Sequence, residues 1–526
     1  MPGESDSRHP TLPPEGGGKQ RGQAATRPPW AIHLQPGSQI PREDEAARQY
    51  LRRGNLPEAL LAAGSGAALV AGNRTLSHDE LKHAATAAAR RLEEAGVKPS
   101  AHVAIFAESS LEWIVAYLGL QLLGATVISI NPALKATEAL HIFSDSEASV
   151  VLVDAEREPV TNSLKPRLPK LRAILQIVGS GAIRGVGAMG PVDGPSLQPE
   201  SPALILYTSG TTGRPKGALL DHGNLLAQAR GVIEAWRWTA NDRLVLALPL
   251  FHVHGLAIAL HGSLMAGGCA RLVRFDPETV VTELRKGATM FFGVPAMYQR
   301  LCDYLERHPT DLSQVRLFVS GSAPLPPNLF DRCQRLLGQR VLERYGLTEG
   351  GIVVSNPYDG PRQPGRVGHP LPGVEIRLGD QDEVELKGGQ VFSGYWQNPQ
   401  ATAEAFHDGW FRTGDIGEVG ADGSLAITGR LKELIISGGY NVYPREVELV
   451  LEQHPAVAEV AVAGLPSERW GEEVTAFVVT RTAIEARELI AYSRERLATY
   501  KCPRAIRFID AIPRNAMGKV DRSQLK

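Results

Sequence analysis

The sequence predicts an α/β fold with two parts: a large N-terminal domain of α/β subdomains with mostly parallel sheets, and a small C-terminal α+β domain. The chain has 526 residues, whereas single hydrophobic cores stop growing at roughly 250–300 residues, so at least two domains are expected. Helical patterns alternate with short β-branched runs over most of the chain, which favours parallel sheets. The pattern restarts beyond Gly429 and continues for about a hundred residues, a size typical of one small domain.

The first forty residues predict a disordered extension. They are rich in Gly, Pro and Arg and lack the apolar stretch of a signal peptide. An Arg-rich organelle transit peptide is the alternative, but such peptides are poor in acidic residues, and Glu4, Asp6 and Glu15 come early. We therefore expect an extension over residues 1–40, the large domain over 41–430 and the small domain over 431–526.

The first half of the large domain alternates helix and strand. Ser77–Ala95 has helical spacing, whereas Val103–Ile105 and Val150–Val153 are short β-branched runs. Gly179–Pro199 is rich in Gly and Pro and predicts a linker that leads to a strand at Ala203–Tyr207.

One apolar run approaches the length of a membrane span. It extends from Trp113 to Ile130, and about 20 apolar residues cross a bilayer as a helix. Because Gly119, Gln121 and Gly124 interrupt the run, we expect a buried helix that ends near Gly124, followed by a strand at Ala125–Ile130, and no membrane insertion.

Later strands of the large domain mark a candidate site. Leu244–Leu248, Met290–Phe292 and Leu317–Ser320 are apolar, and each is closed by Gly, Pro or His. Ligands bind at the carboxyl ends of strands in open parallel sheets, so a ligand site is expected where these strands end.

The small domain is predicted from a second set of elements. They are a short strand at Leu434–Ser437, a helix near Pro444–His454 and strands at Val457–Val462 and Val474–Val479.

Charge and cysteine content limit the partners. The chain has 56 basic and 57 acidic residues, so no overall field attracts nucleic acid or an anionic membrane, and small molecules are the expected partners. Four cysteines lie far apart without a CxxC spacing, which predicts neither a zinc site nor a disulfide framework and fits the reducing cytoplasm.

A loop rich in Gly and hydroxyl residues predicts nucleotide binding. The segment Tyr207-Thr-Ser-Gly-Thr-Thr-Gly-Arg-Pro-Lys216-Gly follows an apolar strand, and its backbone N–H groups can cradle phosphate oxygens. It is not a Walker A loop, because Gly217 stands where Ser or Thr would hold magnesium. The candidate ATP-binding residues of the loop are Thr208, Ser209, Gly210, Thr211, Thr212, Gly213 and Lys216.

At this point the sequence resembles the superfamily of adenylate-forming enzymes, which includes acyl-CoA synthetases, peptide-synthetase adenylation domains and luciferases. The resemblance covers about Glu43 to Lys526, and further family motifs follow in order. They are Tyr345-Gly-Leu-Thr-Glu349, Thr413-Gly-Asp415, Gly429-Arg430-Leu-Lys432 and Pro513-Arg-Asn-Ala-Met-Gly-Lys519. The resemblance implies an AMP-forming acid–thiol ligase that uses ATP, Mg²⁺ and coenzyme A.

The resemblance also implies roles for individual residues. Thr348 meets the α-phosphate, and Glu349, with Thr211, ligates magnesium, which prefers hard oxygen donors. Asp415 and Arg430 bind the ribose. Ser322, Ala323, Pro324, Tyr345 and Gly346 complete the implied ATP site.

Two implied roles concern domain rotation. Lys519 stabilises negative charge as the carboxylate attacks the α-phosphate. Lys432 is the hinge about which the mobile small domain rotates after adenylation, and this rotation brings Gly438, Gly439 and Tyr440 to the coenzyme A channel.

Within the superfamily the chain is most similar to malonyl-CoA synthetases. The similarity rests on Phe251-His-Val-His-Gly255, Ser320-Gly-Ser-Ala-Pro-Leu325, Glu343-Arg-Tyr-Gly-Leu-Thr-Glu349, Ser355-Asn-Pro-Tyr-Asp-Gly360, Arg362, Pro364-Gly365, Val367-Gly368 and Pro370-Leu-Pro-Gly-Val374. A dicarboxylate needs a cationic partner for its distal carboxylate. The candidate acyl-site residues are His252, which we also expect to be catalytic, with His254, Arg300, Ser320, Gly321 and Leu347.

Several alternatives stay open. Arg300 fits equally well as a solvent-facing residue, because arginine is mostly exposed. Leu347 and Gly350-Gly351 stand where many relatives have Met and Thr-rich sequence, so the pocket could admit methylmalonate or a longer acid. A medium-chain fatty or aromatic acyl-CoA synthetase is the second candidate.

Other classes of function are weaker candidates. A carrier-loading adenylation enzyme would need a carrier on a separate chain. A non-catalytic nucleotide-binding descendant is disfavoured because Lys519, Glu349 and Asp415 are all present. A luciferase-like oxidation is compatible with the motifs, but nothing in the composition favours it. The oligomeric state, monomer or dimer, is left open.

Overall fold

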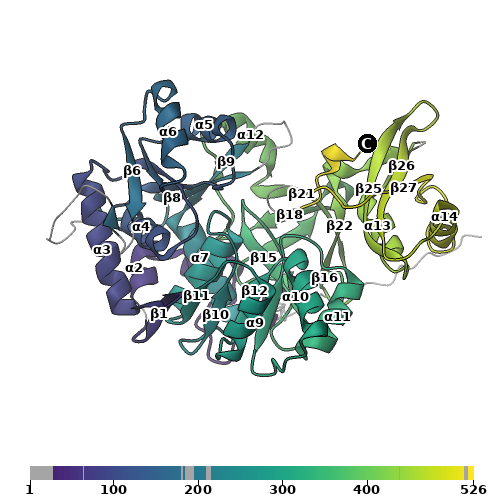
Figure 1. Cartoon of the computed structure of the whole chain (residues 1–526), viewed down its shortest axis with the longest axis horizontal. Coiled ribbons are helices and arrows are strands. Elements are labelled where there is room, and N and C mark those ends of the chain that lie inside the picture. The colour runs from purple at the N-terminus through teal and green to yellow at the C-terminus, as the bar shows by residue number, and fades with distance from the viewer. Residues whose placement is uncertain are drawn as a thin grey trace, which may run out of the picture.

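The structure is a computed structural model that describes residues 28–62, 64–178, 182–183, 195–208, 215–437, 439–514 and 519–525. Within these ranges the strands form sheets of 14, 8 and 5 strands. The two larger sheets build the N-terminal part, and the smallest sheet forms a separate lobe at the C-terminal end of the chain (Figure 1).

The eight-stranded sheet is parallel at its centre. In spatial order its strands are β19 (Gly394–Tyr395), β9 (Lys216–Asp221), β8 (Pro202–Thr208), β4 (Thr126–Ser129), β3 (His102–Phe106), β5 (Val150–Val153), β6 (Ala173–Val178) and β7 (Ala182–Ile183). The pairs from β8 through β4, β3 and β5 to β6 are parallel.

Side chains of β3 alternate between two hydrophobic cores, because successive residues of a strand point to opposite faces. Val103 and Ile105 join the core that includes residues of α3 (His78–Glu94) and α4 (Leu111–Leu122). Ala104 and Phe106 join the core that includes residues of α5 (Ala136–Asp145) and α6 (Glu158–Leu164). Helices therefore cover both faces of this sheet, as the sequence predicts.

The 14-stranded sheet changes from parallel to antiparallel along its length. Its parallel part consists of β1 (Ala67–Ala71), β11 (Cys269–Leu272), β10 (Arg243–Leu246), β12 (Met290–Gly293), β13 (Leu317–Ser320) and β14 (Leu342–Leu347). Its antiparallel part consists of β15 (Gly351–Ser355), β16 (Arg366–Pro370), β22 (Leu425–Arg430), β21 (Trp410–Val419), β18 (Glu383–Lys387) and β17 (Glu375–Leu378). Two further strands, β2 (Arg74–Ser77) and β20 (Phe406–His407), pair with β1 and β21.

Helices connect these strands and cover the sheets. They are α1 (Asp44–Arg52), α2 (Leu56–Leu61), α7 (His222–Ala235), the π-helix η4 (His254–Leu260), α8 (His261–Met265), α9 (Pro277–Arg285), α10 (Pro295–Arg307), α11 (Pro327–Leu337) and α12 (Pro399–Ala405). Helix α3 begins at a capping box, in which Ser77 and Glu80 satisfy each other's backbone N–H groups.

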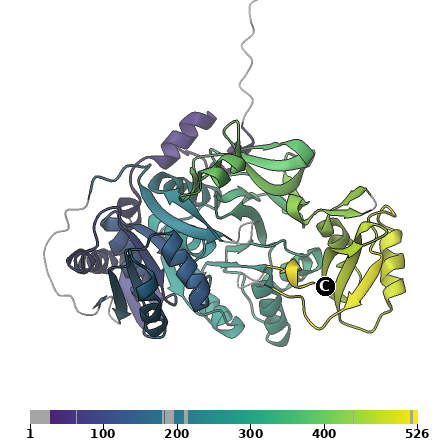
Figure 2. The ribbon, with the colours of Figure 1, turned by 90° about the horizontal axis from the view of Figure 1, so that it is seen from above.

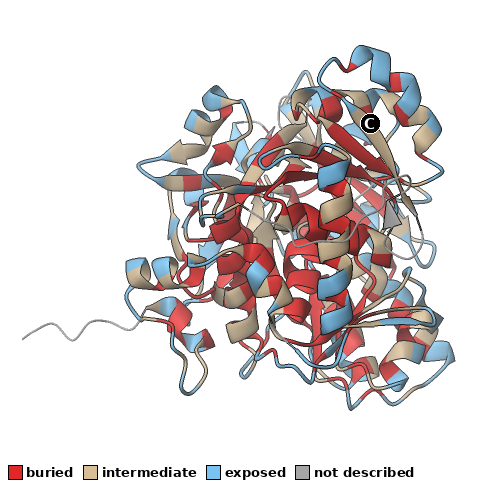
Figure 3. Cartoon of the chain, turned by 90° about the vertical axis from the view of Figure 1, so that its left-hand side faces the viewer, coloured by how far each residue is buried: buried red, intermediate tan, exposed pale blue. Residues whose placement is uncertain are grey.

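The apolar run from Trp113 to Ile130 folds as predicted. Helix α4 ends at Leu122, and β4 follows as a buried strand. In the part of the chain that the structure describes, no helix is both long and apolar enough to cross a membrane. Figure 3 shows that the buried residues concentrate in the interior of the molecule, where the helices pack on the sheets.

The predicted disorder of residues 1–40 is corrected for residues 28–40. Pro29–His33 form a short 3-10 helix, and the side chain of Trp30 is fully buried. Its Nε1 donates a hydrogen bond of 2.6 Å to Asp44 Oδ1. Burial of this large aromatic side chain fixes a segment whose Gly- and Pro-rich composition had predicted disorder. Residues 1–27, like most of the predicted linker Gly179–Pro199, lie outside the described residues.

The small C-terminal lobe has its own sheet and core. Its strands are β24 (Tyr440–Val442), β23 (Ile435–Ser437), β26 (Gly471–Thr480), β25 (Val457–Ser467) and β27 (Ala505–Phe508), with helices α13 (Pro444–Leu451) and α14 (Ala486–Arg494). Figure 2 shows this lobe beside the large part of the molecule. The last strand of the large sheet ends at Arg430 and β23 begins at Ile435, so residues 431–434 connect the two parts.

Candidate active site

Two strands hold the ends of the predicted nucleotide loop. Strand β8 ends at Thr208 and β9 begins at Lys216, and these two residues lie opposite each other in the antiparallel pair. Thr208 Oγ1 donates a hydrogen bond of 3.5 Å to Glu349 Oε1. The base of the loop therefore contacts the predicted magnesium ligand. Outside the described residues lie Ser209, Gly210, Thr211, Thr212 and Gly213.

Glu349 is a buried carboxylate in the turn after β14. The hydroxyl of Tyr395 donates a hydrogen bond of 3.0 Å to Glu349 Oε1. Burial raises the pKa of the Glu349 carboxyl, whereas its own backbone N–H, the Tyr395 hydroxyl and the Lys519 ammonium lower it. Mg²⁺ is usually bound by one or two carboxylates together with substrate phosphates. Glu349 therefore fits a magnesium ligand beside the loop.

The turn that carries Glu349 requires glycine. Gly351 has φ +61°, and a Cβ at this position would lie 1.8 Å from Gln228 Oε1. Gly346 is equally constrained, because its Cβ would lie 2.1 Å from the carbonyl oxygen of Gly351. Close packing of β14 and β15 thus fixes the position of Thr348 and Glu349.

Asp415 and Arg430 form an ion pair that strand register sets. They lie opposite each other on β21 and β22, and Arg430 Nε is 2.6 Å from Asp415 Oδ1. Tyr345 donates a hydrogen bond of 2.6 Å to Asp415 Oδ2. The Asp415 carboxylate raises the pKa of Arg430. The structure thus brings together three of the predicted ATP-binding residues.

Lys519 lies in the same cluster, although it belongs to the C-terminal segment. Burial lowers the pKa of its ammonium to about 8. Arg430 and Arg344 lower the pKa of Lys519 further, whereas Asp415 and Glu349 raise it. The predicted catalytic lysine therefore lies among the predicted ribose and magnesium ligands.

His252 lies close enough to Lys519 to feel its charge, and His254 begins the π-helix η4. Burial lowers the pKa of His252 to about 4, and the Lys519 ammonium contributes to this decrease. Burial and Arg344 lower the pKa of His254 well below its usual value. The ring of His254 stacks on Phe292, with centroids 6.4 Å apart. Both imidazoles are uncharged at neutral pH, so they can form hydrogen bonds but cannot act as cationic anchors.

Arg344 is a buried cation on β14. Its Nη2 donates a hydrogen bond of 3.5 Å to Ser322 Oγ, and Ser322 Oγ lies 3.4 Å from His254 Nδ1. Among the residues that the structure describes, no Asp or Glu forms an ion pair with Arg344, and its Nε has no hydrogen-bond partner. Burial lowers its pKa to about 9. A Cβ at Gly321 would lie 2.3 Å from Arg344 Nε, so only glycine leaves room for this guanidinium.

The serines beside Arg344 also belong to this part of the site. Ser320 Oγ is buried, and none of the residues that the structure describes forms a hydrogen bond with it. Ser322 has φ +69°, and non-glycine residues with such strained backbone cluster at functional sites. The loop continues with Ala323 and Pro324. Arg344, Ser322 and His254 are thus linked by hydrogen-bond contacts, and Ser320 lies two residues before Ser322, at the end of β13.

Two family models match the chain, one in its large N-terminal part and one in its small C-terminal part. Residues 60–396 match the model of the AMP-binding enzyme family, and residues 446–519 match the model of the AMP-binding enzyme C-terminal domain. The chain belongs to the AMP-binding enzyme family.

Similar proteins share this family and its chemistry. The 7a-methyl-1,5-dioxo-octahydroindenyl-propanoyl:CoA ligase of Mycobacterium tuberculosis is 37% identical and covers 87% of this chain and 95% of its own length. The malonate–CoA ligase of Arabidopsis thaliana is 34% identical and covers 83% and 79%. ATP-bound MatB from Rhodopseudomonas palustris is 35% identical, with a TM-score of 0.84 over 90% of this chain and 98% of MatB.

These findings confirm the predicted fold class, family and reaction class. The protein is an AMP-forming acid–CoA ligase whose substrates are a small carboxylic acid, ATP and coenzyme A. The TM-score falls from 0.84 with ATP-bound MatB to 0.75 with apo MatB. The arrangement described here is therefore closer to that of the ATP-bound relative.

Arg300 and Leu347, two other predicted acyl-site residues, differ in exposure. Leu347 ends β14 and is half-buried beside the Glu349 turn. Arg300 is exposed on α10, and its guanidinium lies 5.0 Å from the centroid of the Phe275 ring. The described contacts thus place Arg300 on the surface and leave Arg344 as the cation beside His254.

The structure describes two of the predicted coenzyme A residues, Gly439 and Tyr440. Tyr440 is exposed, and its ring stacks on Tyr500 with centroids 4.8 Å apart. Gly439 has φ +82°, and Gly438 lies outside the described residues. Lys432 is exposed in η6 (Leu431–Glu433), between the two parts of the enzyme.

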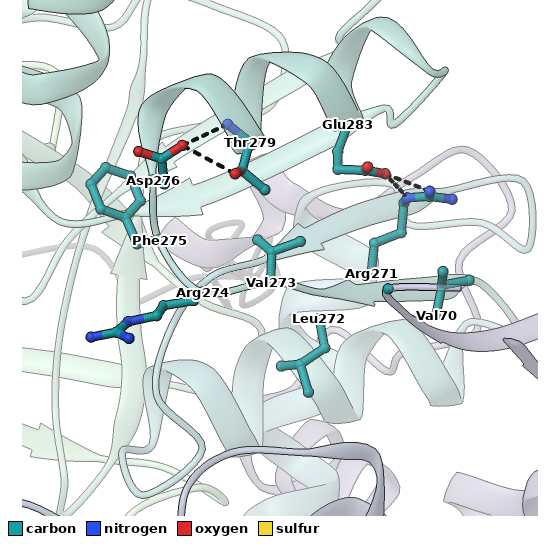
Figure 4. Close-up of a pocket in the computed structure, with 10 residues that line it drawn as sticks. Val70, Arg271, Leu272, Val273, Arg274, Phe275, Asp276, Thr279 and Glu283 are labelled. Carbon is teal, nitrogen blue, oxygen red and sulfur yellow. Dashed lines mark hydrogen bonds and ion pairs between the residues drawn. The ribbon is translucent and has the colours of Figure 1, made fainter. Parts of the chain in front are cut away.

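A surface hollow in another part of the enzyme is a weaker candidate for the active site. It has a volume of about 490 Å³ and lies beside β11 and α9. Figure 4 shows that Arg271 pairs with Glu283 and that Asp276 caps Thr279, whereas Arg274 points away from both pairs. Its charged groups thus mostly satisfy one another, and it contains none of the predicted site residues.

Two residues that sequence reasoning missed are Arg344 and Tyr395. Arg344 is a charged residue inside a buried strand. A charge at such a position is the signal that could have identified it as a site residue. Tyr395 meets Glu349 across 46 residues, and no local pattern connects them.

Proposed function

We propose that this enzyme activates malonate, or a methyl-branched malonate, as an acyl-AMP and transfers the acyl group to coenzyme A. The observation that carries the proposal is the buried guanidinium of Arg344, which has Ser322 and His254 beside it and forms no ion pair with any carboxylate of the described residues. A buried cation without a counter-charge is costly. The distal carboxylate of a dicarboxylate would supply that charge, and a guanidinium binds a carboxylate through two parallel hydrogen bonds.

In the first half-reaction, the proximal carboxylate oxygen attacks the α-phosphorus of ATP and the bond to pyrophosphate breaks. We assign Lys519 to the negative charge that develops at the α-phosphate, and Asp415 with Arg430 to the ribose. Thr348 and the loop from Thr208 to Lys216 would orient the phosphates. Magnesium, held by Glu349, would neutralise phosphate charge.

In the second half-reaction, the sulfur of coenzyme A attacks the acyl carbon and the C–O bond to AMP breaks. Lys519 belongs to the small domain, whereas the groups it meets belong to the large domain. We propose that rotation at Lys432 withdraws Lys519 and brings Gly439 and Tyr440 to the thiol channel. Hinges of this kind are loop positions that absorb large dihedral changes.

A second candidate substrate is a bulky propanoate. The Mycobacterium tuberculosis relative, which is 37% identical, is named for such an acid. A monocarboxylate of this kind would leave Arg344 without an anionic partner, which is why we rank it second.

The test is AMP release with ATP, Mg²⁺ and coenzyme A across malonate, methylmalonate, octanoate, 4-coumarate and an indenyl propanoate. Each acid is tried with the wild type, Arg344→Met and Arg300→Met. Arg332→Met serves as a matched control, because Arg332 pairs with Glu306 on the surface. The proposal expects malonate or methylmalonate to lead and to lose its advantage in Arg344→Met. A lead for the propanoate, or a loss in Arg300→Met alone, would contradict it.

We also propose a cytoplasmic location, which the lack of paired cysteines supports: Cys269, Cys302, Cys333 and Cys502 are all free thiols. Fractionation of the native cells, with the chain detected by antibody, tests the location. Recovery in an organelle or membrane fraction would contradict it.

A further inference from the structure

Arg522 helps to fix the segment that carries Lys519. Arg522 begins η7 (Arg522–Gln524), three residues after Lys519. Its Nη1 lies 2.9 Å from Glu433 Oε2, its Nη2 lies 2.6 Å from Glu448 Oε1, and its Nε donates a hydrogen bond of 3.0 Å to the carbonyl oxygen of Val462. All three nitrogens of the guanidinium are therefore used.

The three partners belong to three different elements. Glu433 is in η6, Glu448 is in α13 and Val462 is in β25. Glu448 is itself held firmly, because it is buried and its Oε1 also accepts a hydrogen bond of 3.0 Å from the backbone N–H of Val462. A planar guanidinium suits such a three-way junction better than a lysine would.

The contact with Glu433 reaches the segment between the two domains. Glu433 directly follows Lys432, the proposed hinge. Arg522 thus connects the hinge segment to the chain that bears the catalytic lysine. A misplacement of about 1 Å can cost roughly 100-fold in rate, so the anchoring of this segment matters for the position of the Lys519 ammonium.

We propose that Arg522 is a positioning residue for adenylation: it ties the Lys519 segment to the hinge and to α13, so that the hinge conformation determines whether Lys519 reaches Asp415 and Glu349. This inference rests on the role proposed for Lys519. It assigns no contact between Arg522 and a substrate.

The test separates the two half-reactions in the full-length enzyme. Adenylation is measured as pyrophosphate release with ATP and malonate, and thioesterification as AMP release from supplied malonyl-AMP and coenzyme A. Arg522→Met is expected to slow adenylation about tenfold, the loss expected for one charge-assisted hydrogen bond, and to leave thioesterification within about twofold. Glu433→Gln, which weakens only the hinge contact, should give a smaller loss of the same kind.

A readout independent of activity is hydrogen exchange of the peptide that spans residues 513–521, which should be faster in Arg522→Met. Arg481→Met is the matched control, because Arg481 holds backbone carbonyls of Pro455 and Val457 in the same domain. Equal losses in both half-reactions, or unchanged exchange and adenylation, would overturn the inference. Lys519→Ala separates a failure of the Arg522 inference from a failure of the role proposed for Lys519. If Lys519→Ala keeps the full rate of adenylation, the role of Lys519 is wrong as well.

Discussion

The nucleotide side and the acyl side of the site handle charge differently. On the nucleotide side, Arg430 pairs with Asp415, and Glu349 accepts a hydrogen bond from Tyr395. On the acyl side, Arg344 forms no ion pair with any carboxylate among the described residues, and burial lowers the pKa of both histidines. Charged groups that are already paired before binding suit ATP, which is the same nucleotide whichever acid is activated. A buried cation without a partner suits a site whose substrate brings the missing charge, and this contrast is the basis for the malonate proposal.

The largest effect is expected at Lys519, which lies between the two sides. Lys519→Ala should lower the rate of adenylation by about 100- to 1000-fold, the range for loss of one donor to a developing oxyanion. Thioesterification of supplied malonyl-AMP should keep most of its rate, because that step follows withdrawal of Lys519. Single-turnover measurement of each half-reaction checks this. Equal losses in both steps would contradict the domain-rotation model.

The pH dependence of adenylation tests the same residue. Lys519 must be protonated to stabilise negative charge, and burial lowers its pKa to about 8. In the free enzyme, kcat/KM for ATP should therefore be level below pH 8 and fall about tenfold per unit at higher pH. Lys519→Arg should remove this alkaline limb, because arginine stays charged. An unchanged limb in Lys519→Arg would assign the limb to another group.

On the nucleotide side, removal of one charge should weaken ATP binding. Asp415→Asn should raise KM for ATP about 30-fold, because charged hydrogen bonds to the ribose are lost and Arg430 is left without its partner. Glu418→Gln on the same strand is the control, since Glu418 is exposed and pairs with Arg366 on the surface. Similar KM values in the two variants would show that Asp415 does not bind ATP.

The smallest effect is expected at Tyr395. Tyr395→Phe removes one hydrogen bond to Glu349 and should raise the Mg²⁺ concentration for half-maximal adenylation about three- to tenfold. Titration of free Mg²⁺ at saturating ATP measures this. Tyr492→Phe, on α14 of the small domain, is the control. A change in maximal rate without a shift in the Mg²⁺ midpoint would argue against a role in magnesium binding.

Much of the fold followed from the sequence because strand and helix patterns are local. Val150–Val153 and Leu317–Ser320 are strands with the predicted bounds, and the apolar run at Trp113 ends as a helix before a strand. The order at Trp30 was missed, because it depends on a hydrogen bond to Asp44 and on burial against distant residues.

The site was predictable to a similar extent. Motif residues such as Asp415 and Arg430 were named correctly as neighbours, and strand register brings them together. The sequence motif could not identify Arg344 as an anchor for the substrate. That proposal depends on the fold, in which none of the described carboxylates forms an ion pair with Arg344. Arg300 was a candidate because an arginine suits a carboxylate partner, and its alternative as a solvent-facing residue is the one that α10 supports.

If Arg344 selects a second carboxylate, the enzyme should distinguish malonate from malonamate. Malonamate has the same shape, but its distal group is neutral. In the wild type, we expect kcat/KM for malonate to exceed that for malonamate about 100-fold, because only malonate forms a bidentate charged contact with Arg344. In Arg344→Met, this ratio should fall to about one. Equal use of both acids by the wild type, or an unchanged ratio in Arg344→Met, would contradict the account.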